Sequence, residues 1–130
     1  MKKYIGKYYS IDENDDKIYI GTDFPDEYAN SRYSHHVHGA IGKAKANIAQ
    51  AIPQLIEIAT NMVYQENVEK KHEKDAQAGW YRYTIRFSMS VCDEDRKYVG
   101  RKNYQGRMIV RHDSDGKKYL YDIIDIKKET

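Results

Sequence analysis

The clearest pattern in the chain is a strict alternation of side chains from Trp80 to Val91. One set of alternate positions is mainly apolar and comprises Tyr81, Tyr83, Ile85, Phe87, Met89 and Val91. The other set is mainly polar and comprises Trp80, Arg82, Thr84, Arg86, Ser88 and Ser90. Successive side chains of a β-strand point to opposite faces of the sheet, so a period of two is typical of a strand with one buried face. The pattern predicts a half-buried antiparallel strand.

A hairpin is predicted from residues 107–112 to 117–126. If Gly116 takes the left-handed position of a three-residue loop, three pairs face each other across the strands: Arg111 and Tyr119, Val110 and Leu120, Ile109 and Tyr121. One face then carries Arg111, Tyr119 and Tyr121. The other face is apolar and carries Val110, Leu120, Ile124 and Ile126. Residues 92–106, which precede the hairpin, are expected to form a loop.

The amino-terminal part is predicted to form a hairpin followed by helices. Two short apolar runs at 4–9 and 17–20 flank an acidic, turn-rich segment, as in a β-hairpin. Apolar residues then recur at every third or fourth position from Ile41 to Met62, which is typical of the buried face of a helix. Pro53 interrupts this stripe and predicts either a kink or the start of a second helix.

The expected fold class is α+β, in a single domain over residues 1–130. We expect an N-terminal hairpin within 1–22, a helical part over 23–78 and an antiparallel meander sheet over 79–130. The hairpin and the helices are expected to pack on the sheet, because each element must bury its apolar side.

The charge is distributed unevenly, although the net charge is only +2. Residues 1–69 carry 7 Lys or Arg against 10 Asp or Glu, whereas residues 70–118 carry 13 against 7. The basic segment also holds several aromatic residues, and this combination suits a ligand with phosphates and stacking bases, such as RNA. The candidate nucleic-acid-binding residues are Trp80, Tyr81, Arg82, Lys97, Arg101, Lys102 and Tyr119. A solvated sheet face of mixed charge is the alternative interpretation.

The same segment contains residue types suited to RNA cleavage without a metal ion. Attack by the 2′-hydroxyl requires a proton acceptor, a proton donor and a cation that stabilises the developing charge. His72 is a candidate acid or base, because an imidazole titrates near neutral pH. The other candidate catalytic residues are Arg86 and Arg111, which can hold a phosphate through two hydrogen bonds, and Tyr121. A solvent-exposed histidine and cross-strand packing of Arg on Tyr is the alternative.

Three histidines, His35, His36 and His38, lie close together and are a weak candidate for a zinc or nickel site. An exposed loop or helix entry is the more natural interpretation, and no cofactor is expected. The chain lacks a Gly-rich phosphate loop, a Gly-x-Ser-x-Gly elbow and a His-Glu-x-x-His motif, so ATPases, α/β-hydrolases and zincins are unsupported.

The chain has no run of 18 apolar residues, and its start does not resemble a signal peptide. Its single cysteine, Cys92, cannot form an internal disulfide. These features predict a cytoplasmic protein with no membrane partner.

Five segments together resemble a known family, namely residues 24–28, 39–47, 71–76, 79–83 and 111–130. The likeness covers roughly residues 20–130 and is to the C-terminal domain of MuF-like phage head proteins and other large polyvalent proteins of phages and mobile elements in Firmicutes. These domains are grouped with, or placed close to, the barnase/EndoU/colicin/RelE-like (BECR) ribonuclease fold. The resemblance implies helices followed by a four-stranded antiparallel sheet, and a toxin-type ribonuclease that needs no metal. The matching positions are His72, Trp80, Tyr81, Arg86, Arg111, Tyr119 and Tyr121.

Three hypotheses follow for function. The first is a phage or mobile-element effector in the host cytoplasm that cleaves host RNA, for which a cognate immunity protein would be a natural partner. The second is a non-catalytic anti-defence protein, similar to anti-CRISPR proteins, that binds a host nuclease or nucleic-acid complex through basic residues at 97–102. The third is an accessory of head assembly, which would show neither activity.

Overall fold

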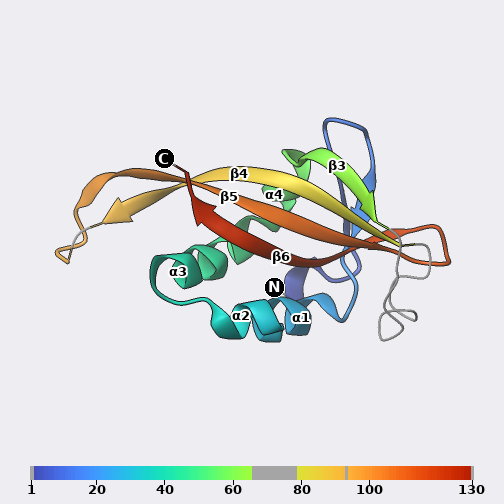
Figure 1. The fold of residues 1–130 in the computed structure, drawn as a ribbon, viewed down its shortest axis with the longest axis horizontal. Helices are drawn as coiled ribbons and strands as arrows, with labels where there is room; N and C mark the ends of the chain where they lie inside the picture. The colour runs from blue at the N-terminus through green and yellow to red at the C-terminus, as the bar shows by residue number, and fades with distance from the viewer. Residues whose placement is uncertain (1, 66–78, 93, 130) are drawn as a thin grey trace.

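The computed structural model describes residues 2–65, 79–92 and 94–129. This part of the chain is α+β, with helices packed on a six-stranded sheet of order β1-β2-β6-β5-β4-β3 (Figure 1). The strands are β1 (Tyr8–Ser10), β2 (Lys17–Tyr19), β3 (Thr60–Gln65), β4 (Trp80–Cys92), β5 (Tyr98–His112) and β6 (Lys118–Lys128). The helices are η1 (Lys2–Tyr4), α1 (Phe24–Asn30), α2 (Arg32–His36), α3 (Gly39–Ile48), η2 (Ala49–Ala51) and α4 (Ile52–Glu57).

The sheet joins an amino-terminal hairpin to a carboxy-terminal antiparallel meander, both of which the sequence predicts, and β3 pairs with β4 at one edge. Strands β4, β5 and β6 form an antiparallel meander, and β1 and β2 form an antiparallel hairpin. The two units meet where β2 runs parallel to β6, with Ile18 beside Lys118 and Tyr19 beside Tyr119. The amino-terminal hairpin therefore extends the sheet instead of packing on it.

The core lies on one face of the sheet, between the strands and the helices. The fully buried sheet residues include Tyr83, Ile85, Met108, Val110, Leu120 and Ile123. They pack with apolar side chains of the hairpin and helices, including Ile11, Ile18, Phe24, Ile52 and Ile56. Each such side chain contributes about 1.5–3 kcal/mol on burial. The predicted apolar face of β4 is confirmed, because Tyr83 and Ile85 are buried and Tyr81, Phe87 and Met89 pack against the core.

Residues 60–65 form strand β3, so the prediction of a helical part extending to residue 78 is wrong at this position. The helical stripe ends earlier: Pro53 lies in the first turn of α4, which is the second helix that the sequence allowed. The chain then pairs with β4 and leaves Met62 and Val63 exposed. The recurrence of apolar residues at every third or fourth position continues by chance beyond the helices into residues 60–65. In this segment Thr60, Val63 and Tyr64 are residue types that favour a strand.

The loop expected at residues 92–106 is largely strand. From Trp80–Arg111 to Cys92–Tyr98, β4 and β5 pair along a long hairpin that projects beyond the helices (Figure 1). The β5 half of this projecting part is mostly polar, so hydrophobic patterning gave no signal for it, and its backbone groups are satisfied by pairing with β4. We call residues 88–92 and 94–103 the projecting hairpin.

The predicted register of the last hairpin is confirmed near the turn and wrong beyond it. Arg111 faces Tyr119 and Val110 faces Leu120, but a bulge then places Ile109 opposite Asp122 instead of Tyr121. An extra residue shifts every later side chain to the other face. Ile123 is therefore fully buried where Ile124 was expected in the core. A second irregularity near Asp125, which has a φ of 52°, returns Ile126 to the core.

Candidate functional site

A row of side chains crosses five strands on the face opposite the core. The pairing registers place Tyr8 beside Tyr19, Tyr19 beside Tyr119, Tyr119 beside Arg111 and Arg111 beside Trp80. Their chain neighbours Ile18, Val110 and Leu120 are fully buried, so alternation turns the row outward. We call Tyr8, Tyr19, Tyr119, Arg111 and Trp80 the cross-strand row.

The members of the cross-strand row contact one another and are flanked by lysines. The ring centroids of Tyr8 and Tyr19 are 5.3 Å apart, and those of Tyr19 and Tyr119 are 5.9 Å apart. The ammonium of Lys17 lies 5.2 Å from the Tyr8 ring and that of Lys117 lies 5.1 Å from the Tyr19 ring. Aromatic rings with interspersed cations form a surface on which bases can stack while lysines meet phosphates.

Arg111 lies in this row between Tyr119 and Trp80 and is held by several groups. Its guanidinium lies 4.8 Å from the Tyr119 ring, bonds to the carboxylate of Asp23 and approaches Asp113 with an Nε–Oδ1 distance of 3.4 Å. The Arg111 side chain is only 12% exposed. The backbone at Gly21 lies close to this ion pair, because a Cβ on Gly21 would lie 2.9 Å from Asp23 Oδ1 and 3.4 Å from Arg111 Nη2.

Helix α1 brings a second carboxylate to the same region. The amide of Glu27 donates to the carbonyl of Asp23, so the two acids lie one turn apart on the side of α1 that faces the sheet. Burial raises the pKa of Glu27, and repulsion from Asp122 raises it further. A hydrogen bond from the Tyr121 hydroxyl acts in the opposite direction. A carboxyl group whose pKa is raised towards neutrality is suited to proton transfer.

Tyr121 links this carboxylate to the cross-strand row. Its ring meets the Trp80 ring edge-on, with centroids 4.9 Å apart, while its hydroxyl bonds to Glu27. We call Asp23, Glu27, Arg111 and Tyr121 the α1 cluster. It combines a carboxyl group, a phenol and a guanidinium beside a large aromatic ring, which are the groups needed to bind a nucleotide and transfer its protons.

A buried ion pair lies near the α1 cluster. Lys45 Nζ lies 2.8 Å from Asp122 Oδ1, and the two side chains are 5% and 4% exposed. The ammonium also lies 4.6 Å from the Tyr28 ring and 4.9 Å from the Tyr33 ring. Burial lowers the pKa of Lys45 and raises that of Asp122. The pair links α3 to β6 and places the Asp122 carboxylate near Glu27.

The structure brings together four residues that the sequence singled out: Trp80, Arg111, Tyr119 and Tyr121. It does not bring Arg86 to them. Arg86 faces Gln105, roughly 20 Å along β4 from the position opposite Arg111. The Arg86 side chain is 73% exposed, with Nε 3.3 Å from Glu129 Oε1. The two arginines therefore do not clamp a single phosphate.

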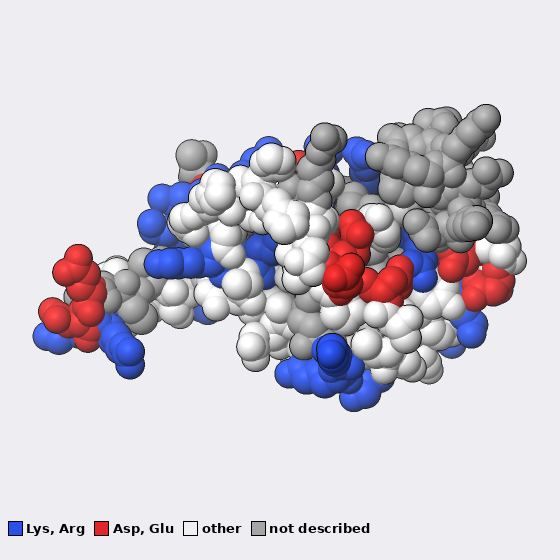
Figure 2. Space-filling model, turned by 90° about the horizontal axis from the view of Figure 1, so that it is seen from below, with Lys and Arg blue, Asp and Glu red and all other residues white. Residues whose placement is uncertain are grey.

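Other candidate residues lie apart from the α1 cluster. Tyr81 lies on the core face, with its ring 5.2 Å from Tyr64 and 5.6 Å from His112. Arg82 lines a shallow hollow on the outer face together with Val63 and other residues. The candidates on the projecting hairpin are Lys97, Arg101 and Lys102. Figure 2 shows acidic and basic side chains together at its tip, so this arm is not purely basic. His72 lies outside the described residues.

The three neighbouring histidines sit at the end of α2 and just before α3. Within the described part of the chain, no group of three or more His, Cys, Asp or Glu side chains is placed to hold a metal ion. His35, His36 and His38 are therefore not gathered into such a group.

Sequence reasoning missed Asp23, Glu27 and the buried pair of Lys45 and Asp122. The acids at the start of α1 have an ordinary explanation, since carboxylates favour helix N-termini. Lys45 falls among apolar positions of α3, and a lysine in a predicted buried stripe is a usable signal for a buried partner.

The chain matches no protein family, curated protein or solved structure with which it was compared. No helix in the described ranges is long and apolar enough to cross a membrane.

Proposed function

We propose that the protein binds single-stranded RNA along the cross-strand row and cleaves it at the α1 cluster without a metal ion. The observation that carries the proposal is the position of Glu27. This half-buried carboxyl group has a raised pKa and a hydrogen bond from Tyr121, whose ring meets that of Trp80, the residue paired with Arg111 across the sheet. Acid–base groups and a base-stacking surface thus meet at one place.

The chemistry is an attack of the 2′-hydroxyl on the adjacent phosphorus. Glu27 accepts the hydroxyl proton as the 2′-oxygen bonds to phosphorus, and the bond to the 5′-oxygen breaks. The leaving oxygen takes a proton from Tyr121 or from His72. Arg111 stabilises the charge on the phosphoryl oxygens once a phosphate replaces the half-exposed Asp23 as its partner. The products are a 2′,3′-cyclic phosphate and a free 5′-hydroxyl, so DNA is not a substrate.

The order of elements supports placing this activity in the BECR-like effectors that the sequence resembles. The resemblance implies helices followed by a four-stranded antiparallel sheet; here the antiparallel strands β3, β4, β5 and β6 follow the helices, and β1 and β2 extend the same sheet. On this proposal the protein is a phage or mobile-element toxin that acts on host RNA in the bacterial cytoplasm, and an immunity protein restrains it.

Incubation of the purified protein with tRNA and total RNA in EDTA tests the proposal. We expect fragments that end in 2′,3′-cyclic phosphate, and no cleavage of DNA of the same sequence. Tyr121→Phe and His72→Ala identify the proton donor, because the donor variant should lose about 10²–10⁴-fold in rate. Protein that leaves every RNA pool intact would refute cleavage.

A second candidate function, inhibition of a host nuclease or nucleic-acid complex, is favoured by the projecting hairpin. Tyr98 and Val99 on this arm are 64% and 60% exposed, beside Arg101 and Lys102. An arm with exposed apolar and basic side chains suits insertion into a partner. Reversing Lys97, Arg101 and Lys102 to Glu should then abolish a stoichiometric complex while Glu27→Gln preserves it.

A further inference from the structure

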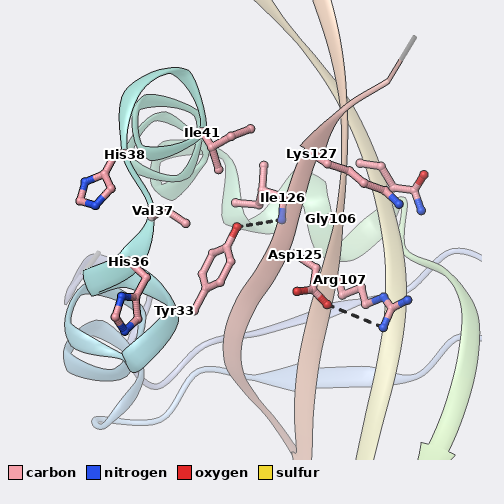
Figure 3. A pocket seen from close by; sticks show the side chains of 11 residues that line it. Tyr33, His36, Val37, His38, Ile41, Gly106, Arg107, Asp125, Ile126 and Lys127 are labelled. Atoms are coloured by element: carbon pink, nitrogen blue, oxygen red, sulfur yellow. Dashed lines mark hydrogen bonds and ion pairs between the residues drawn. The ribbon is translucent and has the colours of Figure 1, made fainter.

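A second concave site lies between the helices, the middle of β5 and the carboxy-terminal end of β6 (Figure 3). Its volume is about 600 Å³, and its walls come from α2, α3, residues 105–107 of β5 and residues 125–127 of β6. A cavity of a few hundred Å³ is the size of a small-ligand site. It shares no residue with the cross-strand row or the α1 cluster.

The inner surface of this pocket is apolar, with one directed hydroxyl. Val37 and Ile41 from the helices lie across from Ile126 (Figure 3). The Tyr33 oxygen accepts the amide proton of Ile126 at 2.9 Å, so its own proton remains available to donate. Burial raises the pKa of Tyr33, which keeps this hydroxyl protonated. The surface suits a flat, weakly polar group such as a nucleobase.

The rim of the pocket carries an excess of basic side chains. His36 and His38 lie on the helical side, and Arg107 and Lys127 lie on the strands. Among the residues that line the pocket, Asp125 is the only acid, and its Oδ2 lies 3.7 Å from Arg107 Nη1. Both of these side chains are about half exposed, so this pair is weak and exchangeable. A phosphate can therefore compete for Arg107.

The second β-bulge creates this arrangement. Asp125 has a φ of 52°, and the register between β5 and β6 shifts between Gln105 and Arg107. A bulge re-aims the side chains beside it. Here Ile126 enters the core while Asp125 and Lys127 remain at the mouth of the pocket.

We propose that this pocket binds a nucleotide: the base lies on Val37, Ile41 and Ile126, and the phosphate is held by Arg107 and Lys127. The ligand chemistry is the same for a free mononucleotide and for the terminal nucleotide of an RNA. The site is independent of cleavage, because its residues are separate from Glu27 and Tyr121.

Isothermal titration with AMP, with adenosine and with inorganic phosphate tests the site. AMP should bind more tightly than either fragment, since base and phosphate contribute together. Arg107→Gln and Lys127→Gln should each weaken AMP binding about tenfold, whereas the matched variants His35→Gln and Lys128→Gln change residues outside the pocket and should leave it unchanged. The substituted side chains are exposed, so the fold should persist.

A short RNA with a 3′-phosphate, used with Glu27→Gln protein to prevent cleavage, separates the two ligand sources. AMP binding that depends on Arg107 indicates a free nucleotide, and Arg107-dependent binding of the RNA alone indicates a chain terminus. Binding of neither probe, or equal binding by the Arg107 and Lys128 variants, overturns the proposal. The two proposals can fail separately. If the wild-type protein shows no ribonuclease activity but AMP binding persists in Glu27→Gln, the proposed function is refuted and the nucleotide site is retained.

Discussion

Glu27 carries an energetic cost in the folded protein, and the proposed function gives a reason for it. Burial raises its pKa, so the folded state binds this proton more tightly than the unfolded chain does. The ionised form therefore weakens the fold above the raised pKa, and the cost vanishes below the ordinary glutamate pKa of about 4.3. A carboxylate that destabilises the protein at neutral pH is typical of a functional site.

Glu27→Gln is accordingly expected to raise the midpoint of thermal unfolding at pH 7 and to change it little at pH 3.5. Scanning calorimetry at the two pH values measures the difference, with the exposed Glu57→Gln as the matched control. Equal shifts at both pH values would mean that the carboxyl group of Glu27 is not strained by burial.

The buried pair of Lys45 and Asp122 makes a second prediction at the residue scale. Asp122→Asn leaves the Lys45 ammonium buried without its counter-charge, and removing one partner of such a pair destabilises a protein by about 3–5 kcal/mol. Urea unfolding measures the loss. The double variant Lys45→Met with Asp122→Leu should recover most of it, and a double variant as unstable as the single one would contradict this account.

A third prediction at the residue scale concerns Gly21, because the absence of a side chain there allows Asp23 to reach Arg111. In Gly21→Ala the new Cβ would lie 2.9 Å from Asp23 Oδ1, so the carboxylate must move, and Arg111 loses the partner that holds its guanidinium in place until a phosphate binds. We expect RNA cleavage to fall while the fold persists. Gly42→Ala is the control, since its Cβ meets only Val37 O at 3.5 Å. Unchanged activity in Gly21→Ala would remove the Asp23–Arg111 pair from the site.

At the scale of elements, the proposed RNA-binding surface depends on how separate strands align their side chains. The cross-strand row exists because β2 joins β6 in parallel and places Tyr19 beside Tyr119, which continues the line from Trp80 to Tyr8. A shift of one residue in any of these pairings would turn one member into the core.

Alanine substitutions along the row test this alignment. Loss of a stacked ring weakens single-stranded nucleic-acid binding by about 1–3 kcal/mol. Tyr8→Ala, Tyr19→Ala and Trp80→Ala should each show such a loss for an RNA oligonucleotide in fluorescence anisotropy. Tyr98→Ala, an exposed tyrosine on the projecting hairpin, should show none. A loss at Trp80 alone would limit the binding surface to the α1 cluster.

The sequence predicts the elements that bury one regular face and misses those set by backbone pairing. The alternation through β4 and the turn at Gly116 suffice for β4, for the last hairpin and for the pairing of Arg111 with Tyr119. The bulge after Val110 leaves no trace in the hydrophobic pattern, because Ile123 and Ile124 are equally apolar. The strand character of residues 98–103 is likewise hidden, since these residues are exposed or only partly buried and project beyond the core.

The candidate site shows the same division. Trp80, Arg111, Tyr119 and Tyr121 share a face that strand periodicity can predict. Asp23 and Glu27 reach that face only because α1 packs against β6, and no local spacing encodes this long-range contact. Sequence reasoning therefore finds the strand-borne half of the site and misses the helix-borne half.

At the scale of the molecule, the two faces of the sheet have different roles. One face builds the core with the helices, and the other presents the cross-strand row. The α1 cluster forms where α1 meets β6, and the pocket proposed to bind a nucleotide forms further along the same strand. Two bulges in β6 shape these places, so one strand positions both proposed sites.

The central claim is that Glu27 acts as the proton acceptor in metal-free RNA cleavage. The most direct measurement is the single-turnover rate of tRNA cleavage in EDTA by wild type, Glu27→Gln and Glu57→Gln. The account predicts a rate lower by about 10²–10⁴-fold for Glu27→Gln and an unchanged rate for Glu57→Gln. Equal rates for wild type and Glu27→Gln would contradict it.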